Sequence, residues 1–140
     1  MSILFALLSA VSAALVAIFA KVGLEHVDST LATAIRSIVM AVVVVGAALL
    51  LGKVSGETLS AISSKAWFYI VLAGIAGALS WLFYFAAIQA GTTTTVVAID
   101  KLAIVFVVLF AGLFLGEGFS LVTILGSLLM VAGALLIAFK

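Results

Sequence analysis

Two charged residues stand side by side inside a long apolar stretch, and they are the first candidates for chemistry in this chain. Asp100 and Lys101 interrupt the run "TTTTVVAIDKLAIVFVVLF", from Thr92 to Phe110. An ionised side chain in an apolar environment is costly unless it has a partner or faces water. The two residues therefore predict either an ion pair between helices or the charged wall of a cavity.

The composition identifies the environment in which these charges must act. Of the 140 residues, 68% are hydrophobic and only 8% are charged, and the mean hydropathy is +1.59. A water-soluble domain of this size cannot bury so much apolar surface. The net charge of +1 and the scattered lysines give no basis for binding nucleic acid, and the absence of cysteine excludes disulfide and thiol chemistry. The sequence predicts an all-α integral membrane protein.

Apolar runs of membrane-spanning length alternate with short polar breaks along the whole chain. Such continuous runs favour helices over barrel strands, because a spanning helix satisfies its own backbone hydrogen bonds. The first run lacks a basic leader, so we expect it to remain as a helix and not to be cleaved as a signal peptide. The chain thus reads as a single transmembrane domain over 1–140, with helices at about 2–22, 30–51, 66–89, 94–115 and 119–139.

The strongest polar side chains are predicted to lie in one layer of the membrane. At about 1.5 Å per residue, Asp100 and Arg36 each lie roughly 9–10 Å from the same membrane face. The third helix ends on that face, which brings Trp81 and Tyr84 to a similar depth and Gln89 to the rim. The predicted substrate-binding residues are Arg36, Trp81, Tyr84, Gln89, Asp100 and Lys101.

Within this layer Asp100 needs a cation at its own depth. Successive residues on a helix point about 100° apart, so Asp100 and Lys101 should diverge. The long Lys101 side chain can extend toward the near interface, whereas the short Asp100 side chain cannot. We expect Asp100 to pair with Arg36, either to hold two helices together or to form the wall of a substrate cavity.

Trp81, Tyr84 and Phe85 are spaced to form one aromatic face on the third helix. Such a face is either ordinary packing or one side of a cavity that holds a cation or an apolar substrate. Glycine spacings give a second packing signal, with Gly112 and Gly116 in a GxxxG pattern. This pattern favours close helix approach, in a hairpin within one chain or in a dimer.

The loop charges give little preference for one orientation in the membrane. Lys53 and Lys65 lie on the side of the N-terminus, whereas Lys21 and Lys140 lie on the other side. The loops and tail alone thus give a tie, and the embedded Arg36 and Lys101 make the C-terminal side modestly more positive. Because cytoplasmic lysines and arginines set orientation, a tie predicts insertion in both directions. Two oppositely oriented copies would form an antiparallel homodimer with the symmetry of an inverted-repeat transporter.

Three segments carry a resemblance that covers nearly the whole chain: "WLFYFAAIQAG", "VVAIDKLAIVFVVLFAGLFLGE" and "GSLLMVAGALLI". They resemble an EamA-like domain of the drug/metabolite transporter superfamily. The resemblance implies a five-helix repeat that occurs twice, with inverted topology, in larger members, so that one copy needs a partner to form a ten-helix transporter. Larger members usually have a proline after the "ID" position, whereas this chain has none. The resemblance also implies a helix-ending structural role for Glu117.

These features predict a small-molecule transporter in the prokaryotic plasma membrane that exports polar or amphipathic metabolites by alternating access as a dimer. Zwitterions and amphipathic cations are both open as substrates. The alternative is a structural or regulatory membrane subunit that docks on a larger partner through its glycine faces. An enzyme is not expected, because HExxH and GxSxG are absent and His26 lies in a loop beside Glu25 and Asp28. No cofactor or metal is predicted.

Overall fold

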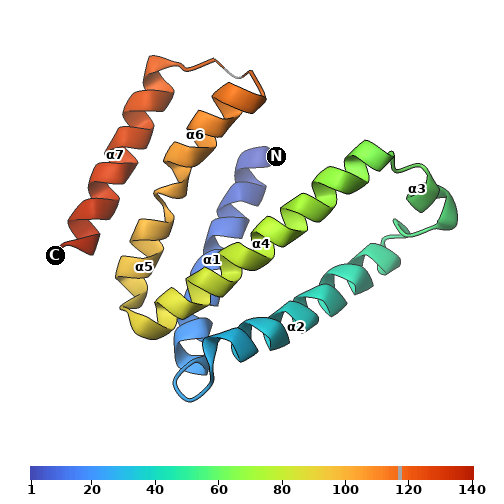
Figure 1. The fold of residues 1–140 in the computed structure, drawn as a ribbon, viewed down its shortest axis with the longest axis horizontal. Helices are drawn as coiled ribbons and strands as arrows, with labels where there is room; N and C mark the ends of the chain where they lie inside the picture. Colours follow the sequence, from blue (N-terminus) through green and yellow to red (C-terminus); the bar gives the residue numbers. More distant parts are fainter. Residues whose placement is uncertain (117) are drawn as a thin grey trace. The chain divides into compact units, whose positions relative to one another are not determined.

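The computed structural model describes residues 1–116 and 118–140, so Glu117 and its predicted helix-ending role lie outside the described residues. Seven helices form in the described part of the chain (Figure 1). They are α1 (Ser2–Gly23), α2 (Ser29–Leu50), α3 (Gly56–Ser60), α4 (Ser64–Ala90), α5 (Thr93–Asp100), α6 (Ala103–Phe114) and α7 (Leu121–Ala138).

Among the described residues, five segments are long and apolar enough to cross a membrane. Four of them are α1, α2, α4 and α7, and the fifth is Thr93–Phe114, which comprises α5 and α6. The number of spanning helices predicted from the sequence is therefore confirmed. The described part of the chain is all-helical, and its five apolar spans are typical of a multi-pass membrane protein.

Most large apolar side chains on these helices point outward. Val42 and Val43 on α2, for example, are 68% and 63% exposed. Lipid covers such surfaces in a membrane, so their exposure carries no penalty there. Several of the buried positions are small instead, including Ala17, Ala98 and Ala134. Small residues let helix backbones approach closely when no hydrophobic force drives association in lipid.

The chain divides into two compact units. The first unit contains residues 1–22 and 90–140, and the second contains residues 23–89. The prediction of a single domain over the whole chain stays a prediction.

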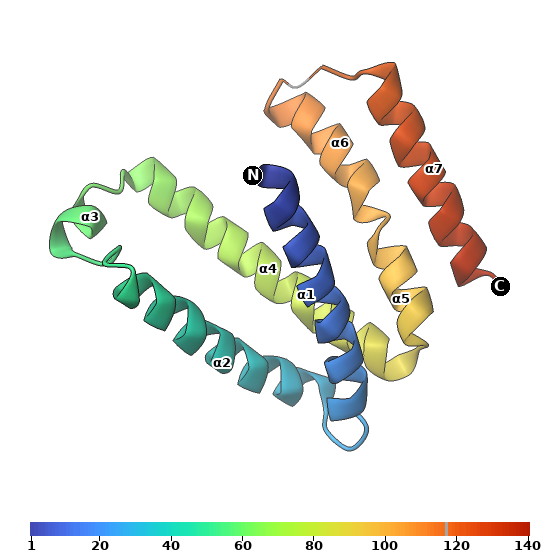
Figure 2. The same cartoon turned by 180° about the vertical axis from the view of Figure 1, so that it is seen from behind.

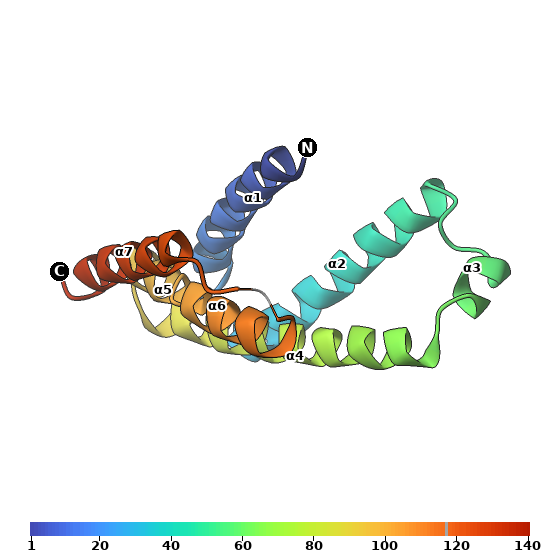
Figure 3. The same cartoon turned by 90° about the horizontal axis from the view of Figure 1, so that it is seen from above.

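The second unit is built from α2 and α4, which are joined through the short α3 (Figure 3). Asp28 begins α2 by accepting hydrogen bonds from the backbone N–H groups of Thr30 and Leu31, at 2.9 and 3.0 Å. Gly52 ends it in a left-handed conformation with φ of 64°. There Lys53 N–H donates to the Ala48 carbonyl, as in a Schellman motif. These two caps fix the segment of α2 that carries Arg36.

A short helix also forms in the loop between α2 and α4, where the sequence predicted only a polar break. The Ser55 hydroxyl accepts a hydrogen bond from Thr58 N–H at 3.1 Å, and the Thr58 hydroxyl accepts one from Ser55 N–H at 2.8 Å. This reciprocal pair is a capping box formed with threonine at the third helical position. The signal was present in the "SGET" sequence, although threonine replaces the usual glutamate or glutamine.

In the first unit α7 packs along both α5 and α6 (Figure 2). The Phe119 ring, from the segment just before α7, lies against Gly112 on α6. A Cβ atom placed on Gly112 would overlap that ring. At Gly112, therefore, the absence of a side chain serves a hairpin within one chain.

The span predicted over 94–115 is two helical segments and not one continuous helix. Helix α5 ends at Asp100 and α6 begins at Ala103, although the chain contains no proline. At the break Leu102 N–H donates to the Ile99 carbonyl at 2.9 Å, and Val105 N–H donates to the Leu102 carbonyl at 3.0 Å. These three-residue hydrogen bonds tighten the backbone into 3₁₀-type turns. The interruption places Asp100 and Lys101 at a helix end within the membrane.

Candidate functional site

Arg36 on α2 stacks on the indole ring of Trp81 on α4. The guanidinium carbon lies 3.6 Å from the centre of the Trp81 ring and 5.5 Å from the centre of the Phe85 ring. Stacking over the electron-rich face of an aromatic ring stabilises a cation, most strongly where water is scarce. This contact joins the two long helices of the second unit.

The aromatic face predicted on the third spanning helix is a set of touching rings. The Trp81 ring centre lies 5.4 Å from that of Tyr84 and 6.0 Å from that of Phe85, and both pairs meet edge to face. Phe85 is buried at 4% exposure, whereas Trp81 and Tyr84 are half-buried. Edge-to-face packing is favourable for aromatic rings and orients the indole face that receives Arg36.

The Arg36 guanidinium has incomplete hydrogen bonding. Nη2 lies 3.8 Å from the Met40 sulfur, which is a weak acceptor. Nη1 is buried and has no hydrogen-bond partner among the residues that the structure describes. An arginine with a buried, unsatisfied donor is an electropositive group that favours an oxygen acceptor, and a ligand reaches this donor only when neighbouring side chains move.

Gln89, predicted at the rim, ties the end of α4 to the connection between α1 and α2. Its side-chain nitrogen donates to the Val27 carbonyl at 2.8 Å and to the Leu24 carbonyl at 3.4 Å. Both donor positions of the amide are thus used on the backbone. Gln89 therefore holds the end of α4 to this connection, and its contact with a substrate stays a prediction.

Asp100 and Lys101 form an ion pair with each other, with 3.1 Å between Nζ and Oδ2. The sequence predicted that they would diverge, on the assumption of a continuous helix. Two features allow the contact: the helix breaks at this point, and the lysine stem is long enough to bend back. Arg36 belongs to the second unit and Asp100 to the first, so the predicted Asp100–Arg36 pair stays a prediction.

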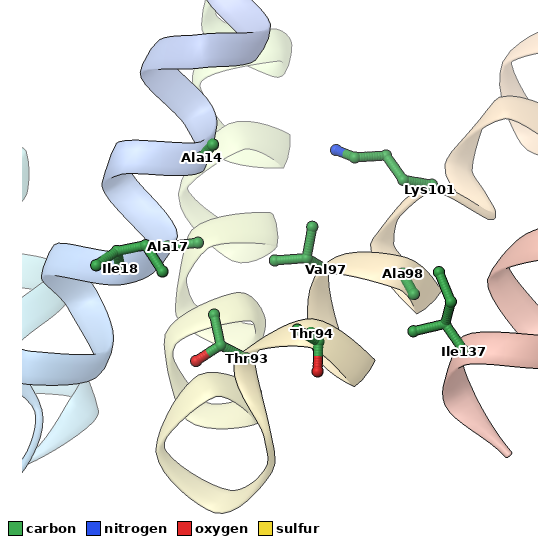
Figure 4. A pocket seen from close by; sticks show the side chains of 9 residues that line it. All are labelled: Ala14, Ala17, Ile18, Thr93, Thr94, Val97, Ala98, Lys101 and Ile137. Carbon is green, nitrogen blue, oxygen red and sulfur yellow. The ribbon is translucent and has the colours of Figure 1, made fainter. Parts of the chain in front are cut away.

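The first unit contains a pocket of about 430 Å³ between α1 and α5 (Figure 4). The Lys101 side chain extends over it, and Ile137 of α7 closes one side. Except for two threonines and Lys101, the lining is aliphatic, and its full set is Ala14, Ala17, Ile18, Thr93, Thr94, Val97, Ala98, Lys101 and Ile137. The charged Lys101 side chain lies beside an otherwise largely apolar wall, and this arrangement suits an amphipathic molecule.

Sequence reasoning found Lys101 but missed the contribution of α1 to this pocket. Ala14, Ala17 and Ile18 are spaced by three and four residues and share one helix face. That spacing was a usable signal, although small residues on one face equally predict simple helix packing. Lys21 further joins α1 to the turn that precedes α5, because its Nζ donates to the Gly91 carbonyl at 2.7 Å.

Comparison with known proteins accords with this architecture. The chain matches the EamA-like transporter family over residues 1–139. A protein of a Sinorhizobium species, named "Uncharacterized transporter in cobO 3'region", is 43% identical over 134 residues, which cover 96% of this chain and 94% of that relative. No solved structure matches the chain significantly. The family and the name of this relative point to transport and not to enzymatic catalysis. The resemblance seen in the sequence is confirmed, and the chain belongs to the EamA-like transporter family.

Proposed function

We propose that this membrane transporter exports polar or amphipathic small molecules from a prokaryotic cell, across the plasma membrane, by alternating access as an antiparallel homodimer. The observation that carries the proposal is the pair of polar features inside spanning helices. One is the largely apolar pocket with Lys101 extending over it, and the other is the stacked Arg36 with an unsatisfied donor. Charged groups at such positions are costly and mark substrate pathways in membrane proteins.

A dimer would supply the second, oppositely oriented half of the transporter, which one five-helix copy lacks. Inverted-repeat transporters enclose their substrate between two halves of opposite orientation. The near-balanced lysines of the loops support insertion in both orientations, which would let one chain provide both halves. The break between α5 and α6 supports a moving element, since backbone interrupted within the membrane accompanies binding sites in transporters.

The alternative of a structural subunit loses one of its supports. It relied on glycine faces for docking on a larger partner, and the Phe119 ring of the same chain covers Gly112, whereas Gly126 and Gly133 on α7 remain open. The transport proposal is therefore the better supported of the two.

The test is uptake into proteoliposomes that contain the purified protein. Vesicles are incubated with a mixture of amino acids, nucleosides and short carboxylates, and their contents are measured by mass spectrometry against vesicles without protein. We expect at least one compound class to enter in a saturable, protein-dependent manner. Equal contents in both kinds of vesicle for every class would contradict the proposal.

A further inference from the structure

The charges within the spanning segments do not balance. Asp100 and Lys101 neutralise each other at 3.1 Å, and in the described part of the chain Arg36 takes part in no ion pair. Arg36 therefore contributes an uncompensated positive charge to the second unit. A positive charge inside a membrane favours a nearby anion, because the low dielectric strengthens the attraction.

The aromatic face is already occupied by this cation. With the guanidinium 3.6 Å from the Trp81 ring centre, a substrate cation would have to displace Arg36 and would meet a like charge. Both effects oppose binding of ammonium compounds at Trp81. Of the substrate types left open by the sequence, amphipathic cations are thus disfavoured at this site.

Arg36 can still donate hydrogen bonds to a ligand. Its buried Nη1 has no acceptor among the described residues, and Nη2 donates to a weak acceptor, the Met40 sulfur. A carboxylate presents two oxygens that match adjacent guanidinium N–H groups, so one ligand would satisfy the donor and neutralise the charge. The half-buried Trp81 ring beside it offers apolar contact to the body of such a ligand.

We propose that Arg36 binds the carboxylate of the transported compound, which makes the substrate an amphipathic organic anion. This inference rests on the proposed transport function and specifies its substrate class. The indole of Trp81 positions the guanidinium and reports on it, because a ligand at Arg36 changes the electrostatic surroundings of the ring.

The experiment uses Trp81 as the only tryptophan of the protein. Trp67→Phe removes the other tryptophan, which lies at the exposed start of α4. Phenylacetate, phenylacetamide and phenethylammonium are titrated into this variant in phosphatidylcholine nanodiscs while Trp81 emission is recorded. The three probes share one ring and differ in charge. We expect a saturable change with phenylacetate alone.

The side chain is tested by Arg36→Gln and Arg36→Lys, with Lys65→Gln as the matched control. Lys65 is a cation of the same unit at the start of α4, outside the aromatic set. We expect Arg36→Gln to weaken the phenylacetate response by about tenfold or more, and Arg36→Lys to retain part of it through charge alone. Lys65→Gln should leave it unchanged. Circular dichroism and gel filtration confirm that each variant is folded, and Arg36→Lys carries the test if Arg36→Gln does not fold.

Three results would overturn the inference. The first is a saturable response to phenethylammonium but not to phenylacetate. The second is a response that appears only after Asp100→Asn, which would show that Asp100 holds Arg36. The third is loss of the phenylacetate response in nanodiscs containing phosphatidylglycerol, which would assign the site to a lipid headgroup.

The inference and the transport function fail separately. If the protein binds phenylacetate through Arg36 but moves no compound into proteoliposomes, the anion site is supported and the proposed transport function is wrong. If the protein transports compounds with neither a preference for carboxylates nor a dependence on Arg36, only the proposed anion site is wrong.

Discussion

At the scale of single residues, the Asp100 carboxylate and the Lys101 ammonium neutralise each other but tolerate separation unequally. Lysine can extend its charged end toward the interface when it loses its partner, whereas the short aspartate side chain stays at its depth. The cost of breaking the pair should therefore depend on which charge is left behind.

We predict that Lys101→Met destabilises the protein more than Asp100→Asn does. Stranding the carboxylate should cost about 2–3 kcal/mol, close to the insertion cost of a charge, and stranding the lysine about 1 kcal/mol. Unfolding in mixed detergent micelles, followed by circular dichroism, measures both. The double variant should recover most of the loss, and an additive loss in this cycle would contradict the pairing.

The stack of Arg36 on the Trp81 ring should stabilise the second unit. Trp81→Leu should lower the free energy of unfolding by about 1–2 kcal/mol through loss of the cation–π contact, in addition to lost packing. In an Arg36→Gln background the same substitution should cost less, since the cation is gone. The difference between the two costs, measured in the same micelles, gives the coupling energy, and a value of zero would mean that the stack contributes no stability.

Arg36, Trp81 and Tyr84 could be chosen from the sequence because polar and aromatic residues stand out at matching depth on apolar helices. Their contacts could not be predicted, since depth fixes one coordinate and leaves the rotation of each helix open. The pairing of Asp100 with Lys101 was missed for a different reason. A regular helix separates neighbours by about 100°, and the contact forms here because the helix breaks and the lysine stem is long enough to bend back.

At the scale of elements, α6 and α7 pack as a hairpin at a glycine. The Phe119 ring occupies the space where a Gly112 side chain would lie. The five spanning helices were predictable from apolar runs, but the break at Lys101 was not. Proline is the usual cause of a kink, and this chain has none.

We predict that Gly112→Ala destabilises the hairpin by about 1–3 kcal/mol, because the new methyl group overlaps the Phe119 ring. Phe119→Ala in the same chain should relieve the overlap and recover part of that loss. Gly126→Ala on α7 is the matched control, since a methyl group there has open space. It should be neutral or stabilise by up to about 1 kcal/mol through helix propensity. Equal effects of Gly112→Ala and Gly126→Ala in thermal unfolding would rule out the contact.

At the scale of the whole molecule, orientation in the membrane decides whether one chain can supply both halves of a transporter. Lys53 and Lys65 on one side balance Lys21 and Lys140 on the other. This charge balance could be predicted from the sequence, because the number of spanning helices assigns each loop to one side of the membrane and the lysines of each side can then be counted. The dimer itself cannot be derived from one chain, since an interface needs a second surface whose position the sequence does not give.

We predict that the protein inserts in both orientations and that its two forms pair. The natural chain contains no cysteine, so Val54→Cys beside Lys53 and Phe139→Cys beside Lys140 each provide a single label site. In intact cells an impermeant maleimide should label each site in about half of the molecules, because a tie in loop charge gives no preference. Permeabilised cells provide the value for complete labelling.

A charge-biased variant extends the test from orientation to function. Ala61→Lys together with Ser63→Lys adds two positive charges to one loop and should direct that loop to the cytoplasm in nearly all molecules. If the two orientations form one transporter, proteoliposomes made from this variant should lose most of their uptake, because opposite partners become scarce. Mixing it with a variant biased the other way, by Glu25→Lys and Ser29→Lys, should restore uptake. Labelling of the natural chain from one face only, with uptake intact, would contradict the antiparallel pair and favour either a parallel dimer or another partner chain.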